Sequence, residues 1–112
     1  MKRGNRILID TNAILEAHRV GCWKALCGFF SMETVEWCIN LLAYAMAQSN
    51  AYLLCSPDKD CMRVGMILDI LRRFVSLEKI AENAGCRRLA LRGQYTEKWH
   101  QSFCGILKLD QL

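Results

Sequence analysis

The chain carries the stretch Ile7-Leu8-Ile9-Asp10-Thr11-Asn12, and this stretch decides the expected fold. Three consecutive apolar residues before a polar turn are typical of a short strand that is buried on both faces, as in a parallel sheet. Either Thr11 or Asn12 is a suitable cap for a helix over residues 13–19. The sequence therefore predicts a buried strand that runs directly into a helix, with Asp10 at the junction.

Strand-like and helix-like stretches alternate along the rest of the chain. The expected elements are a helix over 23–30, a helical run over 34–48 with Ser31 as its cap and Glu33 in its first turn, a strand over 51–55, a helix that starts at Ser56-Pro57-Asp58, a strand over 74–77, a short helix capped by Ser76, and a C-terminal helix over 95–108. Strands separated by helices predict βα units and a parallel sheet. We therefore expect the α/β class, with a small parallel sheet flanked by helices in a single domain over residues 1–112.

The helix that follows Asp58 is expected to be amphipathic. Its apolar residues recur at spacings of three and four, namely Val64, Ile67, Leu68 and Leu71. This spacing places them on one helix face and predicts that the face packs on the core.

The composition is that of a small globular domain. Of the 112 residues 53% are hydrophobic and 23% are charged, which is too apolar for an intrinsically disordered chain. No apolar run approaches the about 18 residues of a membrane span, and only residues 7–9 are apolar after Lys2 and Arg3, so we expect no membrane association and no signal peptide. Seven cysteines at irregular spacing predict buried thiols in the reducing cytoplasm. The net charge of +4 is compatible with nucleic acid as a partner.

Two carboxylates follow expected strands. Asp10 comes directly after residues 7–9, and Asp58 lies shortly after the strand over 51–55. Ligands collect outside the carboxyl ends of parallel strands, so neighbouring strands would bring both carboxylates to one crevice. Such oxygen ligands suit Mg²⁺ or Mn²⁺, which can activate water and stabilise charge on a phosphodiester. Each aspartate also has a plainer alternative role, because a carboxylate at a helix N-terminus caps the helix or interacts with its dipole.

The order of these motifs resembles that of PIN domains. Residues 7–12 resemble the opening PIN strand, a hydrophobic run followed by Asp-Thr/Ser-Asn, and residues 53–59 resemble the later strand that leads to another Asp. Residues 74–77 would match the closing strand, so the resemblance extends over residues 6–85. PIN domains are metal-dependent nucleases, and many are RNA-cleaving toxins held by small antitoxin proteins. The resemblance implies an endoribonuclease that uses Mg²⁺ or Mn²⁺.

PIN domains place about four acidic residues around the metal, and the resemblance assigns three of them here. Asp10 matches the first position, Glu36 the second with Glu33 in reserve, and Asp58 the last. The third position falls on Asn40, a neutral residue that is a weakened ligand at best. The expected catalytic and metal-binding set is therefore Asp10, Glu36 and Asp58.

The chain is shorter than most PIN domains, and the shortfall lies in the central region between Glu36 and Leu41. A short central region and an incomplete acidic set leave an alternative open, a catalytically inactive PIN-like module that binds RNA or a protein partner. A missing segment would also uncover apolar surface, which a homodimer or an antitoxin-like partner would cover. Asn12 is expected to orient a metal ligand or a water by a hydrogen bond, without contacting the metal itself.

Basic residues gather on and after the helix that follows Asp58. Arg63, Arg72 and Arg73 form a candidate surface for contacts with RNA phosphates. The alternative is an ordinary solvated face.

Overall fold

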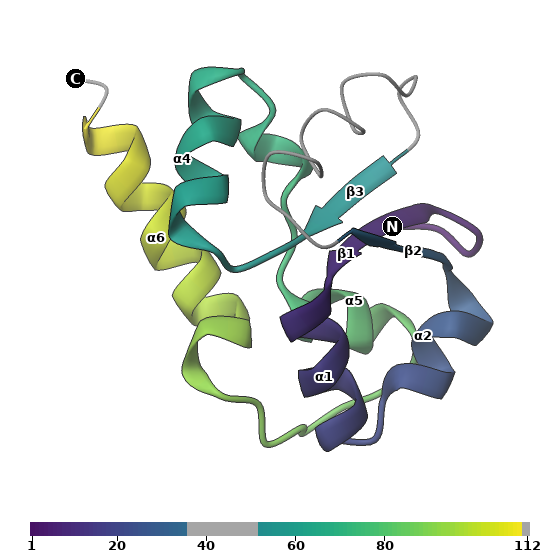
Figure 1. The fold of residues 1–112 in the computed structure, drawn as a ribbon. Helices are drawn as coiled ribbons and strands as arrows, with labels where there is room; N and C mark the ends of the chain where they lie inside the picture. Colours follow the sequence, from purple (N-terminus) through teal and green to yellow (C-terminus); the bar gives the residue numbers. More distant parts are fainter. Residues whose placement is uncertain (36–51, 111–112) are drawn as a thin grey trace.

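The computed structural model describes residues 1–35 and 52–110, which form one small parallel sheet with helices on both faces (Figure 1). The elements in chain order are β1 (Arg6–Asp10), α1 (Thr11–Arg19), α2 (Trp23–Phe29), β2 (Ser31–Val35), β3 (Tyr52–Cys55), α4 (Lys59–Ile67), a 3₁₀ turn (Leu71–Arg73), α5 (Leu77–Asn83), a second 3₁₀ turn (Gly93–Tyr95) and α6 (Glu97–Asp110). The expected α/β class with a small parallel sheet is confirmed.

β1 is the central strand of this sheet. The strand order is β2-β1-β3, and both neighbours run parallel to β1. Ile7 lies beside Met32 of β2 on one side and beside Leu53 of β3 on the other. Ile7, Leu8 and Ile9 are fully buried, which confirms the strand that the opening stretch predicts.

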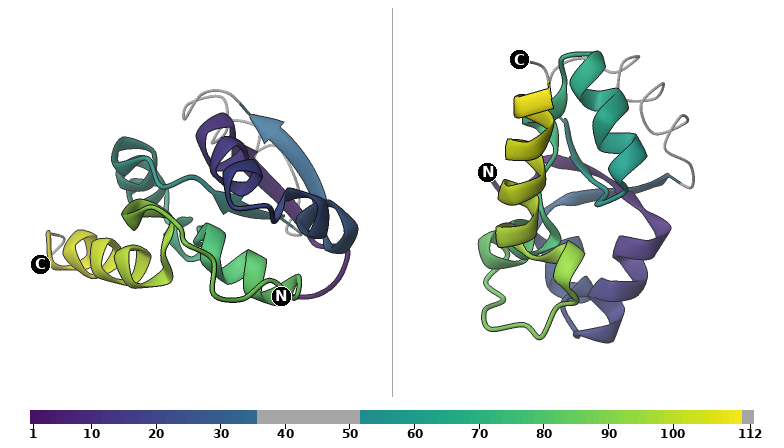
Figure 2. Two further views of the ribbon diagram at one scale, coloured as in Figure 1. Left: turned by 90° about the horizontal axis from the view of Figure 1, so that it is seen from below. Right: turned by 90° about the vertical axis from the view of Figure 1, so that its left-hand side faces the viewer.

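Successive residues of β1 point to opposite faces of the sheet and contribute to two hydrophobic cores. Ile7 and Ile9 belong to a core with residues of α1, α2 and α5, whereas Leu8 belongs to a core with residues of α4, the Leu71–Arg73 turn and α6. Figures 1 and 2 show the same grouping, with α4 and α6 together on one side of the sheet and α1, α2 and α5 on the other. The sheet is therefore the middle of three layers.

α1 begins directly behind the central strand. The Asp10 carboxylate accepts a hydrogen bond of 2.8 Å from the Ala13 N–H and so caps the helix. The expectation that Thr11 or Asn12 is the cap is wrong, because helical geometry already begins at Thr11. Asp10 takes the plainer role that the sequence left open for it.

α4 and α5 also begin at side-chain caps. The Asp58 carboxylate accepts a hydrogen bond of 2.8 Å from the Cys61 N–H, so α4 starts behind Asp58 and not at Ser56. Ser56 instead donates its hydroxyl hydrogen to Asp10. The expected Ser76 cap is confirmed, since its hydroxyl oxygen accepts from the Lys79 N–H.

Residues Ser31–Val35 form β2, so the expectation that Ser31 caps a helix with Glu33 in its first turn is wrong. Serine followed by a nearby glutamate resembles a helix start, but pairing with β1 outweighs that local preference. An ion pair of 2.7 Å between Glu33 and Arg6 of β1 adds to the pairing. The rest of the helical run expected over 34–48 lies outside the described residues.

The expected strand over 74–77 is reduced to a single bridge. Phe74 pairs in parallel with Leu54 of β3, and the Val75 N–H donates to the Leu54 carbonyl at 2.8 Å. The chain then turns into α5 at Leu77, so no ladder extends beyond this point. The C-terminal helix starts later than expected, at Glu97.

α4 presents a different face to the core from the one that the sequence predicts. Cys61, Met62 and Gly65 are buried, whereas Ile67 is 74% exposed. Val64 and Leu68 are also exposed. The helix ends at Ile67 and the chain reverses at Asp69, whose φ of 60° is left-handed, so the spacing that relates Leu71 to α4 is interrupted.

The described cysteines are all free thiols, and they differ in exposure. Cys22, Cys55 and Cys61 are buried, which confirms the expectation for these three. Cys27 is exposed, contrary to it.

None of the helices within residues 1–35 and 52–110 is long and apolar enough to cross a membrane.

Candidate functional site

The carboxyl ends of β1 and β3 form the candidate site, which we call the β1/β3 edge. These strands are direct neighbours, as the sequence argument required. The chain leaves β1 into α1, which packs on one face of the sheet, and leaves β3 into α4, which packs on the other (Figure 1). Neighbouring strands whose connections leave to opposite faces open a crevice at their carboxyl ends, where α/β proteins bind ligands.

Asp10 lies at this edge with both carboxylate oxygens engaged. Oδ1 accepts the 2.8 Å hydrogen bond from the Ala13 N–H, and Oδ2 accepts one of 2.7 Å from the Ser56 hydroxyl. Burial raises the pKa of Asp10, and the negative charge of Asp58 raises it further, while the two hydrogen bonds oppose the increase. The two hydrogen bonds therefore stabilise the charged form of Asp10 by less than burial and the charge of Asp58 destabilise it.

Asp58 is the second carboxylate of the β1/β3 edge. Its side chain is exposed, and one oxygen accepts the Cys61 N–H. Its effect on the pKa of Asp10 shows that the two charges lie close enough to interact. That Asp10 and Asp58 face one crevice stays a prediction from the sequence.

Two further groups at the edge were not identified from the sequence. Ser56 orients the Asp10 carboxylate through its hydrogen bond. The Tyr95 side chain is buried, which raises the pKa of its phenol, and the negative charges of Asp10 and Glu16 raise this pKa further. The phenol therefore stays protonated and able to donate at neutral pH. Tyr95 lies far along the chain from β1, so only tertiary structure brings it here.

The donors at the β1/β3 edge fit a hydrated divalent cation. Asp10 and Asp58 offer hard oxygen ligands, and Mg²⁺ usually binds through one or two carboxylates while it keeps several waters. The Ser56 hydroxyl bonds to Asp10 in the way that second-layer groups orient ligating carboxylates. Within residues 1–35 and 52–110 no group of three or more His, Cys, Asp or Glu side chains could enclose a metal ion.

Of the remaining predicted site residues, the described structure places Glu33 away from this edge. Glu33 is in β2 and pairs with Arg6, the first residue of β1, at the opposite end of that strand from Asp10. Asn12 is exposed in the first turn of α1. Glu36 and Asn40 lie outside the described residues.

The three predicted RNA-contacting arginines lie on the α4 side of the sheet but have different surroundings. Arg63 is exposed, forms an ion pair of 3.2 Å with Asp60 and lies over the Phe103 ring. Arg72 is exposed and donates to the Asp69 carbonyl, while Arg73 is half-buried over the Tyr52 ring. They do not form one continuous row.

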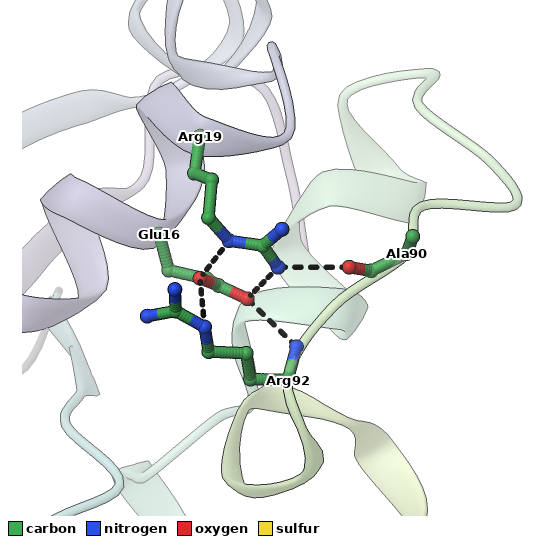
Figure 3. A network of polar contacts seen from close by, with 4 residues as sticks. All are labelled: Glu16, Arg19, Ala90 and Arg92. Atoms are coloured by element: carbon green, nitrogen blue, oxygen red, sulfur yellow. Dashed lines mark hydrogen bonds and ion pairs between the residues drawn. The ribbon is translucent and has the colours of Figure 1, made fainter.

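Glu16 is a buried carboxylate of the described residues that the sequence analysis did not single out. It is 2% exposed on α1, and both of its oxygens accept hydrogen bonds of 2.7 Å from the Arg19 guanidinium (Figure 3). One oxygen also accepts the Arg92 N–H at 2.7 Å, while Arg19 donates to the Ala90 carbonyl. These bonds lower the pKa of Glu16 to about 2, and the hydrogen bonds from Arg19 have the largest effect. They also connect the segment before α6 to α1.

Comparisons with protein-family models, with curated proteins and with solved structures found no match. The resemblance to PIN domains therefore stays a prediction from the sequence.

Proposed function

We propose that this chain is a metal-dependent ribonuclease that binds Mg²⁺ or Mn²⁺ at the β1/β3 edge. The observation that carries the proposal is the parallel pairing of β1 with β3, whose register ends at Ile9 and Cys55, one residue before Asp10 and three before Asp58. The raised pKa of Asp10 adds support, because a cation would stabilise the charged form that burial and Asp58 disfavour. The resemblance to PIN domains supports RNA as the substrate class and a toxin type of activity.

Each residue has its own part in this proposal. Asp10 and Asp58 would hold the metal, and Ser56 would keep the Asp10 carboxylate oriented through its 2.7 Å hydrogen bond. Bound there, the metal would polarise a phosphodiester and lower the pKa of a water. Tyr95 would remain a neutral hydrogen-bond donor beside the edge. Glu36, outside the described residues, is proposed as the third ligand on the strength of the resemblance alone.

Calorimetric titration of Mn²⁺ into the full chain tests the metal site without a guess about the RNA. We expect saturable binding, and a loss of affinity of at least about tenfold in Asp10→Asn, which removes a charge but keeps an oxygen to accept the Ala13 N–H. Glu82→Gln makes the same charge change at an exposed position of α5 and should leave binding unchanged. Equal Mn²⁺ binding by wild type and Asp10→Asn would contradict the proposal.

RNA cleavage with and without EDTA then tests the activity. The expected result is hydrolysis that needs Mg²⁺ or Mn²⁺ and that Asp10→Asn and Glu36→Gln both reduce. Cleavage that persists in Asp10→Asn would exclude the β1/β3 edge as its source.

A second candidate function is favoured by the exposed apolar residues of α4. Val64, Ile67 and Leu68 are 36%, 74% and 40% exposed and follow one another around the end of the helix. Such surface suits an inactive PIN-like module that binds a protein partner or a second copy of the chain. Sedimentation over a wide concentration range, with Ile67→Ser as the control variant, separates the two candidates. A chain that stays monomeric and cleaves RNA would exclude the second.

A further inference from the structure

A pocket of about 400 Å³ lies on the α4 side of the sheet, away from the carboxylates of the β1/β3 edge. It is bounded by the end of α4, the Leu71–Arg73 turn and α6. Its volume lies within the usual range for small-molecule sites, which is about 300–1,000 Å³. Neither the metal site nor the proposed catalysis accounts for it.

The floor of the pocket is apolar and its rim is polar. Leu71 and Phe74 are buried core residues, and Met66 of α4 extends the same apolar surface. The exposed residues of the lining form this rim, namely Asp69, Arg72, Gln101 and Lys108, while His100 and Cys104 are half-buried. A floor and rim of this kind suit a ligand with flat apolar faces and polar edges.

The two cations of the rim come from different elements, which form two walls of the pocket. Arg72 belongs to the 3₁₀ turn and donates to the Asp69 carbonyl at 2.6 Å, which fixes one side of the guanidinium and leaves its other N–H groups for further partners. Lys108 belongs to α6, where it shares a helix face with His100 and Cys104 at spacings of four. An anion in the pocket would therefore meet a positive charge from each wall.

The other titratable groups of the lining carry little opposing charge. Burial lowers the pKa of His100 and raises that of the Cys104 thiol, so both are neutral at pH 7, with the Cys104 Sγ 3.7 Å from the His100 Nε2. Asp69 is the single carboxylate among the lining residues that the structure describes. Arg72 and Lys108 together outweigh it, so the lining has a net charge of +1 (2 − 1).

We propose that this pocket binds a nucleoside monophosphate, with the phosphate between Arg72 and Lys108 and the base on the floor of Met66, Leu71 and Phe74. A phosphomonoester carries close to two negative charges and matches two cations from different elements of the lining. A base has apolar faces for the floor and polar edges for the Gln101 amide. The nucleotide is either free or the terminal residue of an RNA strand.

The two histidines of the chain give a direct test by NMR. His100 lines the pocket, whereas His18 lies on α1 against Trp23, with ring centroids 5.4 Å apart. We expect AMP, CMP, GMP or UMP to shift the ring signals of His100 in a saturable way and to leave those of His18 in place. EDTA is present throughout, so the outcome is independent of the proposed metal site.

Substitutions that change the charge of the rim should weaken or strengthen nucleotide binding according to the charge that they remove. Arg72→Gln should weaken binding by about tenfold or more, because it removes a charge-assisted hydrogen bond to the phosphate. Asp69→Asn should strengthen binding by a few-fold, and asparagine tolerates the left-handed backbone at that position. Lys24→Gln changes an exposed charge on α2 and should have no effect.

Titrations with different ligands show whether the pocket binds a free nucleotide or the end of an RNA strand. Saturation by a mononucleotide supports a free nucleotide, and saturation only by a short oligonucleotide with a terminal phosphate supports an RNA end. No shift of His100 with either would overturn the proposal. An equal shift with inorganic phosphate alone, or binding that Arg72→Gln and Asp69→Asn leave unchanged, would also overturn it.

Discussion

A single buried carboxylate, Glu16, connects two parts of the chain that are 76 residues apart through its bond to the Arg92 N–H. Neutral Glu16 would lose the charge that holds the Arg19 guanidinium and this N–H. Its pKa of about 2, against an ordinary value of 4.5, means that the folded state favours the charged form. A depressed carboxyl pKa contributes stability that is complete above the ordinary pKa and is lost as the pH falls through the folded one.

We therefore expect Glu16→Gln to lower the free energy of unfolding by about 2 kcal/mol at pH 7, a value reduced from the full shift because Arg19 is partly exposed to solvent. The difference from wild type should shrink as the pH falls from about 5 toward 2. Urea unfolding of both proteins at several pH values measures it.

Glu82→Gln is the control for that series, since it removes a carboxylate from an exposed position of α5. Its unfolding free energy should follow that of wild type at every pH. A deficit in Glu16→Gln that stays constant down to pH 2 would show that the ion pairs are not its cause.

The sequence identified Asp10 and Asp58 because each follows an expected strand, Asp10 directly and Asp58 as the third residue after it, and strand ends are recognisable in one dimension. It did not identify Glu16, Ser56 or Tyr95. Glu16 falls within a helix where nothing local distinguishes a buried carboxylate from a solvated one. Ser56 was interpreted as a cap, and its partnership with Asp10 depends on the pairing of two distant strands.

At the scale of an element, α4 depends on a glycine for its contact with the sheet layer. A Cβ at Gly65 would lie 2.5 Å from Cε1 and 3.1 Å from Cζ of Phe74. Phe74 is a buried ring that bridges to Leu54 of β3, so it has little room to move. The absence of a side chain at Gly65 therefore allows the helix to approach the core closely.

We expect Gly65→Ala to destabilise the protein by about 1–3 kcal/mol, because overpacking outweighs the better helix propensity of alanine. Denaturant unfolding measures the change. Gly105→Ala is the matched control in α6, where a Cβ meets no atom within 4 Å, and it should raise stability by about 0.5–1 kcal/mol. Stabilisation by both substitutions would contradict the close packing of α4.

Elements whose local signals agree with their tertiary surroundings were predictable, and the others were not. β1 and the Ser76 cap of α5 were found because burial and capping leave clear patterns. β2 was missed because Ser31 and Glu33 resemble a helix start, while the determinant of the strand is its partner β1. The core face of α4 was misassigned because it includes Gly65. A glycine adds nothing to an apolar pattern, but here its lack of a side chain lets the helix pack closely against Phe74.

At the scale of the whole molecule, the layered core divides the cysteines into accessible and protected thiols. Cys27 is exposed on α2, whereas Cys22 and Cys55 are buried. Burial raises the pKa of Cys22 to about 11 and that of Cys55 well above its usual range. Thiolates, which are the reactive form, are therefore scarce at both buried positions.

We expect a thiol reagent at pH 8 to label Cys27 in the native protein before Cys22 and Cys55, which it labels only at the rate of unfolding. Mass spectrometry of the labelled peptides over time measures the order. In Cys27→Ser the fast labelling at this position is absent, while the slow labelling of Cys55 is unchanged. Labelling of Cys55 as fast as that of Cys27 would show that the sheet is not the closed middle layer described here.

The central position of β1 also has a consequence for the newly made protein. Its partner β3 is encoded far downstream, as the separation of 46 positions between Asp10 and Ser56 shows. At about 5–20 residues per second, a ribosome needs several seconds to produce that length of chain. During this interval the buried apolar residues of β1, Ile7, Leu8 and Ile9, have been synthesised without the β3 strand that pairs with one edge of β1, so this strand is a segment that a chaperone would protect.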